Sequence, residues 1–501
     1  MDMSGIFAAL LAVIGSPYHL LLLLIAVPTG MFFGAVPGLG GKLGIVLAIP
    51  FVFGMDPLAG AIFLVAMHAV VHTGGSIPSI VFGVPGTGPD AATIVDGLPM
   101  TRNGEAGRAI GAALGASAVG GVIGGLFLLA ILPLLRPVVL AFGPSEFLLL
   151  ALFGILFIAL LSGDSLIKGL IIGLFGLMMA CVNLDPQTGS QRYTFDQLFL
   201  WDGIDIITAV LGIFAIPEMI ALGVAGGSIA GRRAQGSNYG LSGVIRGLGD
   251  VFRHWGLTLR TSLIGAFIGM VPGLGGDAAS WICYGHAVQS SKTPERFGKG
   301  AVEGVIAPET ANNSKEGGSL LPTLFFGVPG SSGMAILLGA FVMLGITPGP
   351  ELALEGMDVV LTLIWALMIA NVLAVALFFA LAPAFGYLSY VRGSLLIPFV
   401  FTLTYLGSYL SQRAWENLVL LTALGGLGYL MKKYDWPRPP FVIGLILGPI
   451  MEDSFHKAWA LWGPAFLLRP GALSMLALIA VSLGVYIRQT RRSSTEFPHA
   501  A

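Results

Sequence analysis

A twelve-residue stretch that ends in Pro-Gly-Leu-Gly-Gly occurs twice in this chain, at residues 30–41 and 265–276, which are 235 residues apart. Each copy closes an apolar segment and carries glycines at positions i and i+4. Proline lacks an N–H and clashes with the preceding turn, and glycine tolerates the dihedrals that follow, so each copy predicts a broken helix. Lipid cannot bond the freed backbone groups, which must therefore face protein or a watery cavity.

A second interrupted element also recurs. Residues 74–88 and 317–331 both begin with Gly-Gly-Ser and contain Phe-Gly-Val-Pro-Gly, which lies at 82–86 and 326–330 and recurs at an offset of 244 residues. A membrane span needs about 20 residues, so this piece is too short to cross twice and too interrupted to cross once. It predicts a re-entrant hairpin or a discontinuous helix. Two motifs that recur in the same order indicate a duplicated chain.

Composition identifies the class of protein. Of 501 residues, 55% are hydrophobic and 10% are charged, with a mean hydropathy of +0.88. Soluble proteins have about a quarter charged residues, so the sequence predicts an all-α polytopic membrane protein. The net charge of −1 offers no basis for nucleic-acid binding. Cys181 and Cys283 lie in apolar helical sequence and are expected to be core residues.

Loop charges predict two inverted repeats. Arg102 and Arg108 follow the first hairpin, whereas the charged residues of the matching stretch 345–358 are all acidic. Since Lys and Arg gather on the cytoplasmic side, equivalent loops of opposite charge favour repeats of inverted topology. The expected parts are a first repeat at 1–227, a basic cytoplasmic connector at 228–260, a second repeat at 261–487 and a cytoplasmic tail at 488–501. The breaks are expected at 36–41 and 74–88 in the first repeat and at 271–276 and 317–333 in the second. The loop 185–202 then lies outside.

Further spans are expected between and after these motifs. They lie near 108–133, 137–161, 166–184, 203–227, 256–271, 278–290, 357–382, 393–411, 414–431, 440–468 and 471–487.

The four breaks are expected to converge near the midplane and to form the substrate site. Helix N-termini there carry partial positive charge and free N–H groups, which suit anions. The candidate substrate-binding residues are those at the breaks and the polar residues beside them: Pro37, Gly38, Gly40, Gly41, Lys42, Gly74, Gly75, Ser76, Pro85, Gly86, Thr87, Pro272, Gly273, Gly275, Gly276, Asn312, Asn313, Gly318, Ser319, Pro329, Gly330, Ser331 and Ser332. For any single hydroxyl, a bond to its own helix is the competing interpretation.

Charges in apolar sequence are candidates for function. Lys42 and Asp277 follow the two Gly-Gly pairs at equivalent positions. Lys42 could pair with a substrate carboxylate, although snorkelling or a salt bridge at a helix end is the alternative. Candidate ligands for a coupling ion are Asp277, Thr73, Ser79 and Thr323.

The sequence leaves the roles of two histidines and several carboxylates open. His68 and His72 share one helical face, where they could relay a proton, bond substrate or simply pack. Glu309 and Glu316 could cap helices. Glu218 and Glu452 have no explanation from sequence.

No nucleotide-binding loop or hydrolase motif is present, so the chain is not expected to be an enzyme or to need a cofactor. The alternatives are a passive anion channel of the same architecture and, less favoured, an intramembrane enzyme with Asp277 and His286 as its catalytic pair.

With these motifs in view, the chain resembles the large membrane (permease) subunit of the tripartite tricarboxylate transporter family and is TctA-like. The likeness rests on the two Pro-Gly-Leu-Gly-Gly segments, the two Gly-Val-Pro-Gly segments and Ala-Pro-Glu-Thr-Ala-Asn-Asn at 307–313, and it covers about 17–470. The chain departs from the family at His72-Thr73, Lys42 and Lys315.

The resemblance implies a secondary importer of di- and tricarboxylates in the bacterial inner membrane. It also implies coupling to Na⁺ or H⁺, an elevator-like motion, and two partners. These are a small membrane subunit of four helices and a periplasmic binding protein that delivers substrate.

Overall fold

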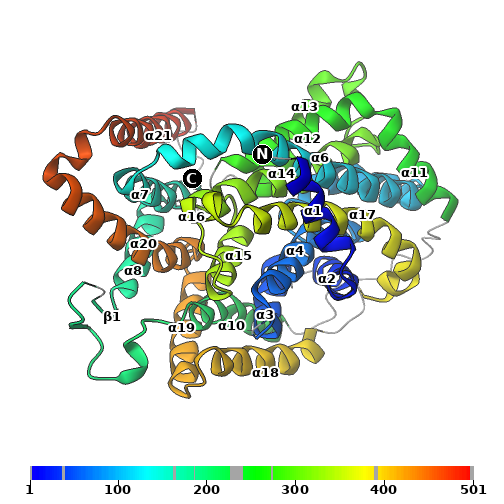
Figure 1. Cartoon of the computed structure of the whole chain (residues 1–501). Helices are drawn as coiled ribbons and strands as arrows, with labels where there is room; N and C mark the ends of the chain where they lie inside the picture. Colours follow the sequence, from blue (N-terminus) through cyan, green and yellow to red (C-terminus); the bar gives the residue numbers. More distant parts are fainter. Residues whose placement is uncertain are drawn as a thin grey trace.

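The computed structural model describes residues 3–36, 40–52, 54–161, 165–185, 187–225, 241–271, 275–388 and 393–496, and most of these residues are helical (Figure 1). The first half contains α1 (Met3–Ile14), α2 (Pro17–Ala35), α3 (Gly40–Val52), α4 (Pro57–Phe82), α5 (Ala91–Arg102), α6 (Ala106–Ala141), α7 (Pro144–Leu161), α8 (Leu166–Ala180), β1 (Asn183–Leu184), β2 (Gln191–Arg192), η1 (Leu198–Leu200), α9 (Ile206–Val210), η2 (Leu211–Ala215) and α10 (Ile216–Ala225).

The second half continues with α11 (Leu241–Arg253), α12 (Trp255–Met270), α13 (Gly275–Ser290), η3 (Pro294–Arg296), α14 (Glu303–Phe326), α15 (Ser332–Met343), α16 (Pro350–Leu354), α17 (Met357–Leu388), α18 (Gly393–Gln412), α19 (Glu416–Lys433), α20 (Pro439–Trp462), η4 (Gly463–Leu468) and α21 (Pro470–Glu496). The short strands β1 and β2 pair antiparallel.

The protein has the helices of a polytopic membrane protein. Among the described residues, four helical stretches are long and apolar enough to cross a membrane: Pro17–Ala35, Pro57–Phe82, Ala106–Leu135 and Met357–Phe379. A fifth candidate is the pair Pro439–Leu468 and Pro470–Gly484, which is bent by 60°. In an 18-residue window of Pro57–Phe82, 94% of the residues are buried within the protein, so this helix forms the centre of the fold.

Helices α2 and α4 pack at backbone distance because glycines line their contact. A Cβ atom on Gly30 would lie 2.3 Å from the Met67 carbonyl oxygen, and one on Gly34 would lie 1.8 Å from the Val71 carbonyl oxygen. From the other side, a Cβ on Gly74 would lie 2.1 Å from the Met31 carbonyl oxygen. Small residues allow this approach between helices that are otherwise apolar.

Helices α12 and α14 repeat the same contact at the equivalent positions. A Cβ on Gly265 would lie 2.6 Å from the Ala311 carbonyl oxygen, and one on Gly269 would lie 2.2 Å from the Lys315 carbonyl oxygen. A Cβ on Gly318 would lie 1.9 Å from the Ala266 carbonyl oxygen. The sequence repeat is therefore also a repeat of helix packing.

The first pair of breaks lies where the sequence predicts it. Helix α2 ends at Ala35 and α3 begins at Gly40, while α12 ends at Met270 and α13 begins at Gly275. The broken residues themselves, 37–39 and 272–274, lie outside the described residues.

The second pair of breaks is shorter than predicted. The expectation of an interruption from Gly74 and from Gly317 is wrong, because α4 continues to Phe82 and α14 to Phe326 with Pro78 and Pro322 inside them. Surrounding helices bury both elements, so an internal proline is tolerated. Each helix ends at a left-handed glycine, Gly83 (φ 67°) or Gly327 (φ 65°).

The connector between the halves is not simply a loop. Residues 226–240 lie outside the described residues, but α11 and the start of α12 occupy the remainder. Helix α11 packs on α6, where a Cβ on Gly111 would lie 2.0 Å from the Val244 carbonyl oxygen. Arg108 Nε donates to Asp250 Oδ2 at 2.6 Å across this contact.

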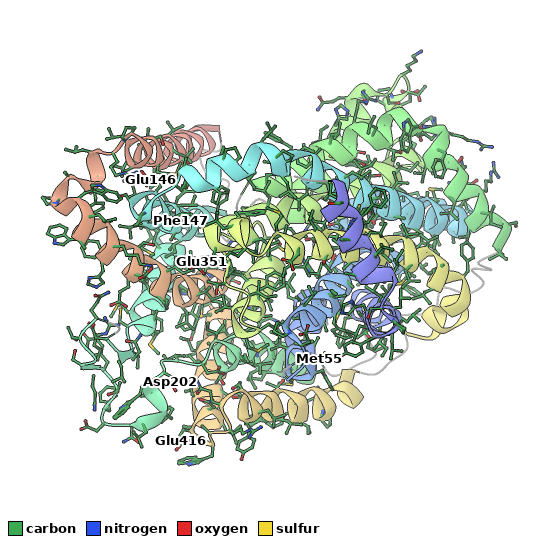
Figure 2. All side chains as sticks on the ribbon, viewed as in Figure 1. Met55, Glu146, Phe147, Asp202, Glu351 and Glu416 are labelled. Carbon is green, nitrogen blue, oxygen red and sulfur yellow. The ribbon has the colours of Figure 1, made fainter. Side chains whose placement is uncertain are left out.

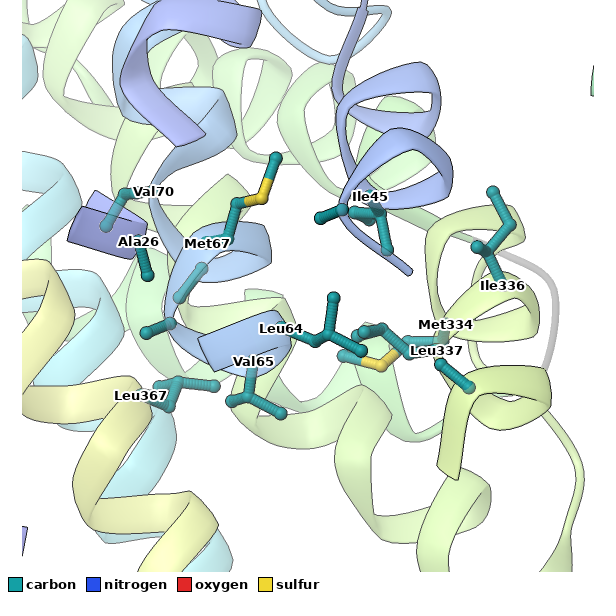
Figure 3. Close-up of a cluster of buried hydrophobic side chains, with 14 of the residues drawn as sticks. Ala26, Ile45, Leu64, Val65, Met67, Val70, Met334, Ile336, Leu337 and Leu367 are labelled. Carbon is teal, nitrogen blue, oxygen red and sulfur yellow. The ribbon is translucent and has the colours of Figure 1, made fainter. Parts of the chain in front are cut away.

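The hydrophobic core surrounds α4. Figure 3 shows side chains of α2, α3, α15 and α17 gathered around those of α4, with Ala26, Ile45, Leu64, Val65, Met67, Val70, Met334, Ile336, Leu337 and Leu367 labelled. Acidic side chains stand in the first turns of α7 and α19, where they complement the helix dipole. Figure 2 labels these two residues, Glu146 and Glu416, on different sides of the molecule.

One carboxylate that the sequence left unexplained pairs with a loop. Glu452 of α20 accepts from both terminal nitrogens of Arg192 in β2, with Arg192 Nη2 at 3.0 Å from Glu452 Oε2. This bidentate contact raises the pKa of Arg192 above its usual value. The side chain of Glu218 lies outside those described.

Candidate functional site

The breaks of the two halves meet in the interior. A Cβ on Gly86 would lie 2.3 Å from the Gly34 carbonyl oxygen, and one on the equivalent Gly330 would lie 2.7 Å from the Gly269 carbonyl oxygen. Each half therefore brings its own two breaks together. A Cβ on Gly276 would lie 2.7 Å from Pro89 Cγ, so the break of the second half also touches the loop of the first.

Helix α14 supplies an unusual run of buried polar side chains at this junction. Beyond Glu303 in its first turn, its polar residues are each at most 2% exposed: Glu309, Thr310, Asn312, Asn313, Ser314, Lys315, Glu316, Ser319 and Thr323. Burying such groups is costly unless hydrogen bonds or ions compensate. Three of them, Glu309, Asn313 and Glu316, find partners on α4, α5 and α6. These partners define the site.

Four ionisable residues form the centre of the site, which we call the His–Glu cluster: His68, His72, Lys315 and Glu316. Glu316 Oε1 contacts Lys315 Nζ and lies 3.1 Å from His72 Nε2. Glu316 Oε2 lies 3.1 Å from His68 Nε2, although neither His68 nitrogen makes a hydrogen bond among the described residues. His72 and Glu316 are equivalent positions of the two halves, so the halves meet here.

A polar chain continues from this cluster into the loop after α4. His72 Nδ1 lies 2.9 Å from Thr87 Oγ1. Thr87 donates its backbone N–H at 2.8 Å and its hydroxyl at 2.7 Å to Asp90 Oδ2. Asn312 Nδ2 donates to Asp90 Oδ1 at 3.3 Å. The first loop is thereby held to α14.

The predicted asparagine pair connects α14 to the surrounding elements of the site. Besides Asn312, Asn313 donates its amide to Asn371 Oδ1 at 2.6 Å, to Thr73 Oγ1 at 3.0 Å and to the Ala69 carbonyl at 3.1 Å. Ala69 and Asn313 are again equivalent positions. Asn371 of α17 is a site residue that sequence reasoning missed.

The interpretation of Glu309 and Glu316 as helix caps is wrong, since both lie inside α14. Glu309 accepts from Thr93 Oγ1 at 2.5 Å and from Ser117 Oγ at 3.3 Å, which ties α14 to α5 and α6. Asp96 plays a similar part, because it accepts from Tyr284 Oη at 3.0 Å and from the amides of Gly300 and Ala301.

Several predicted hydroxyls bond their own helix. Ser76 donates to the Thr73 carbonyl, Ser79 to the Gly75 carbonyl and Thr323 to the Ser319 carbonyl, at 2.7 to 2.9 Å. Ser319 instead donates across to the Gly269 carbonyl at 3.1 Å. Ser331 caps α15 by accepting from the Met334 amide at 3.2 Å.

The remaining candidates are placed as follows. Gly40, Gly41, Gly75 and Gly275 lie at or beside the breaks, Pro329 is buried, Ser332 is half-buried, and Lys42 and Pro85 are exposed. Pro37, Gly38, Pro272 and Gly273 lie outside the described residues, as does the side chain of Asp277. No group of three or more His, Cys, Asp or Glu residues that could hold a metal ion occurs within the described part.

The start of α15 faces the His–Glu cluster. A Cβ on Gly333 would lie 2.5 Å from His68 Cε1, so the first turn of this twelve-residue helix lies against the imidazole. The N–H groups of a first helical turn have no intrahelical partner. The arrangement therefore sets helix N–H groups, an imidazole without a hydrogen bond and a lysine within one polar region, which is a chemistry suited to carboxylates.

Comparison with known proteins agrees with this chemistry. The profile described as "Tripartite tricarboxylate transporter TctA family" matches residues 20–443. The chain belongs to the tripartite tricarboxylate transporter TctA family. The TctA family is a transporter family, and its tripartite systems imply partner subunits.

Two curated relatives of this TctA protein come from Agrobacterium vitis. An uncharacterized 52.8 kDa protein in the TAR-I ttuC' 3' region is 30% identical over 489 residues, covering 95% of each chain. An uncharacterized protein in the TAR-II ttuC' 3' region is 30% identical over 235 residues, covering 46% of this chain and 97% of the relative. No solved structure matches the chain.

Proposed function

We propose that this chain is the membrane-translocating subunit of an ion-gradient-driven importer of di- and tricarboxylates. One observation carries the proposal: helix breaks from both halves meet at a buried polar region that combines Lys315, His68 and the first turn of α15. Membership of the TctA family supports the transport of carboxylates.

The substrate carboxylates bind between the loop 83–90 and the loop 327–331. The N–H groups at the start of α15, the His68 imidazole and the Lys315 ammonium supply donors and positive charge for them. Breaks in the helices supply carbonyl oxygens, which would serve a coupling Na⁺. Alternatively, the coupling ion is H⁺.

The proposed setting is that of a tripartite system of the bacterial inner membrane. A periplasmic binding protein delivers the substrate, and a small membrane subunit of four helices completes the complex. The two halves have inverted topology, and an elevator-like motion of the elements that carry the breaks moves the site across the membrane. The repeated α2–α4 and α12–α14 contacts support two equivalent moving units.

The test is uptake by the complex in liposomes. We expect labelled citrate, succinate or malonate to accumulate only with the binding protein present and only under a Na⁺ or proton gradient. Absence of uptake for every probe under every gradient would reject the proposal. Flux that does not saturate and ignores the gradients would instead identify a passive channel.

A further inference from the structure

The His–Glu cluster contains more ionisable groups than a carboxylate site needs. Glu316 is fully buried and negatively charged when ionised, which opposes the binding of a second anion nearby. Among the described residues it is contacted by Lys315 from its own helix and by His68 and His72 from α4. An acidic group therefore stands between the bases that would hold a carboxylate.

The other buried carboxylates near α14 have partners of their own. Thr93 and Ser117 hold Glu309, while Tyr284 and two backbone amides hold Asp96. Asp90 accepts from Asn312 and is linked to Glu316 through Thr87 and His72. Among the described side chains, Glu316 is thus the carboxylate that directly contacts both the lysine and the histidines.

Lys315 and Glu316 are joined through this geometry. Side chains at i and i+1 of a helix normally diverge, yet here the ammonium of Lys315 turns to meet the carboxylate of Glu316. A buried ammonium without an anion is strongly unfavourable, so Lys315 needs either Glu316 or a substrate carboxylate beside it. The two anions compete for one cation.

We propose that Glu316 is the proton-binding group that couples carboxylate uptake to the proton gradient. The inference rests on the proposed transport function and names its coupling ion. A proton from the outside water binds a carboxylate oxygen of Glu316, with His68 as the adjacent base that passes it on. Neutral Glu316 no longer holds Lys315, so the ammonium pairs with the incoming substrate carboxylate.

Release reverses the sequence. On the inner side the proton leaves Glu316 through His68, the restored carboxylate reclaims Lys315, and the substrate is displaced. Proton and substrate thus promote each other's binding, which thermodynamic linkage requires to be reciprocal. His72 keeps Glu316 in place, because it bridges this carboxylate to Thr87 of the opposing loop.

The deciding variant is Glu316→Gln, which keeps the shape of the side chain but cannot release or bind a proton. We test it in the reconstituted complex with labelled citrate, succinate and malonate as probes. An inward-directed proton gradient should drive accumulation of the probe by the wild type. In E316Q this drive should disappear while counterflow of the same probe persists, since exchange needs no net proton movement.

The substrate affinity supplies a second measurement. In the wild type, affinity for the transported probe should rise on acidification, on the order of 5- to 150-fold for couplings of ordinary strength. In E316Q the affinity should no longer depend on pH. The matched control is Glu309→Gln on the same helix, which should keep both the proton drive and the pH dependence.

E316Q could fail to fold because Lys315 is left without a counter-charge. The double variant Lys315→Gln with E316Q then serves instead, because both members of the pair are neutral. This double variant should show no proton uptake when the probe is added to weakly buffered protein, whereas the wild type and E309Q should take up protons. Proton-driven accumulation by E316Q, loss of coupling in E309Q, or loss of counterflow in folded E316Q would each overturn the inference. Wild-type uptake driven by Na⁺ alone would overturn it and leave the proposed function standing, while no uptake at all would remove both.

Discussion

A carboxylate buried among helices is stable only if its oxygens receive hydrogen bonds or ions, and Glu309 and Glu316 meet this need differently. Within the described part of the chain, Glu316 is surrounded by basic groups, whereas the donors to Glu309 are two hydroxyls. The difference separates a group that can exchange a proton with its neighbours from one that fastens three helices together.

The hydroxyl donors of Glu309 give a prediction at the residue scale. Thr93→Val removes the hydroxyl that donates to Glu309 Oε1 at 2.5 Å and keeps the side-chain size nearly the same. The free energy of unfolding should therefore fall by about 1–3 kcal/mol. Ser117→Ala removes the 3.3 Å donor and should cost less. Thermal unfolding of both variants in detergent tests the order, and an equal or reversed effect would contradict the role given to Thr93.

Asn313 gives a second prediction at this scale. Its amide has three acceptors, of which Asn371 Oδ1 at 2.6 Å is the closest. Asn371→Ala removes that acceptor but leaves Thr73 and Ala69, so we expect a loss of about 1 kcal/mol in stability. Asn313→Ala should cost more, because it leaves all three acceptors without this donor. Melting temperatures of the two variants in parallel provide the comparison.

At the scale of elements, the repeated glycine contacts predict matched effects in the two halves. Gly34→Ala and Gly269→Ala would bring the new Cβ to within 1.8 Å and 2.2 Å of a carbonyl oxygen, much closer than van der Waals contact allows. The first substitution should force α2 and α4 apart, and the second α12 and α14. Each should destabilise the protein by about 1–3 kcal/mol. Since the breaks rest on the same glycines, uptake should fall as well.

Gly426→Ala in α19 is the control for this pair, because nothing lies within 4 Å of a Cβ at that position. It should be neutral or stabilise by about 0.5–1 kcal/mol, as alanine usually does in a helix. Thermal unfolding and citrate uptake are measured for all three variants. Normal stability of G34A and G269A would show that the helices do not depend on this close approach.

The same elements show what the sequence could predict. The two Pro-Gly motifs, 235 residues apart, predict the first pair of breaks correctly, because Pro-Gly acts locally on the backbone. The sequence predicts the second pair of breaks too early, because Pro78 and Pro322 are accommodated within helices that other helices enclose. Local chemistry favours an interruption there, and tertiary packing overrides it.

The cluster was only partly predictable for a related reason. Charges in apolar helices indicate that His68, His72 and Glu316 are candidates for function, but the sequence does not predict that they contact one another. His72 and Glu316 are equivalent positions, and equivalent residues of a duplicated chain meet where the two units contact each other. Asn371 and Thr93 carry no motif, so only the folded structure reveals them.

At the scale of the whole molecule, the expected inversion of the repeats remains a prediction that topology can decide. The first hairpin is followed by Arg102 and Arg108 and the second by Glu351 and Glu355, which favours opposite sides of the membrane. Asn103 and Glu355 are exposed in these two turns. Cysteines introduced at the two positions should therefore react with membrane-impermeant maleimide from opposite sides.

The background for this experiment replaces Cys181 and Cys283, which are half-buried and buried, with alanine. A cysteine at Asn103 should be labelled only in inside-out vesicles and one at Glu355 only in intact spheroplasts, because the basic turn is held on the cytoplasmic side. Labelling of both from one side would mean that the halves run parallel. The His–Glu cluster could then not be exposed alternately by equivalent motions of two inverted units, and the elevator-like transport cycle would need a different structural basis.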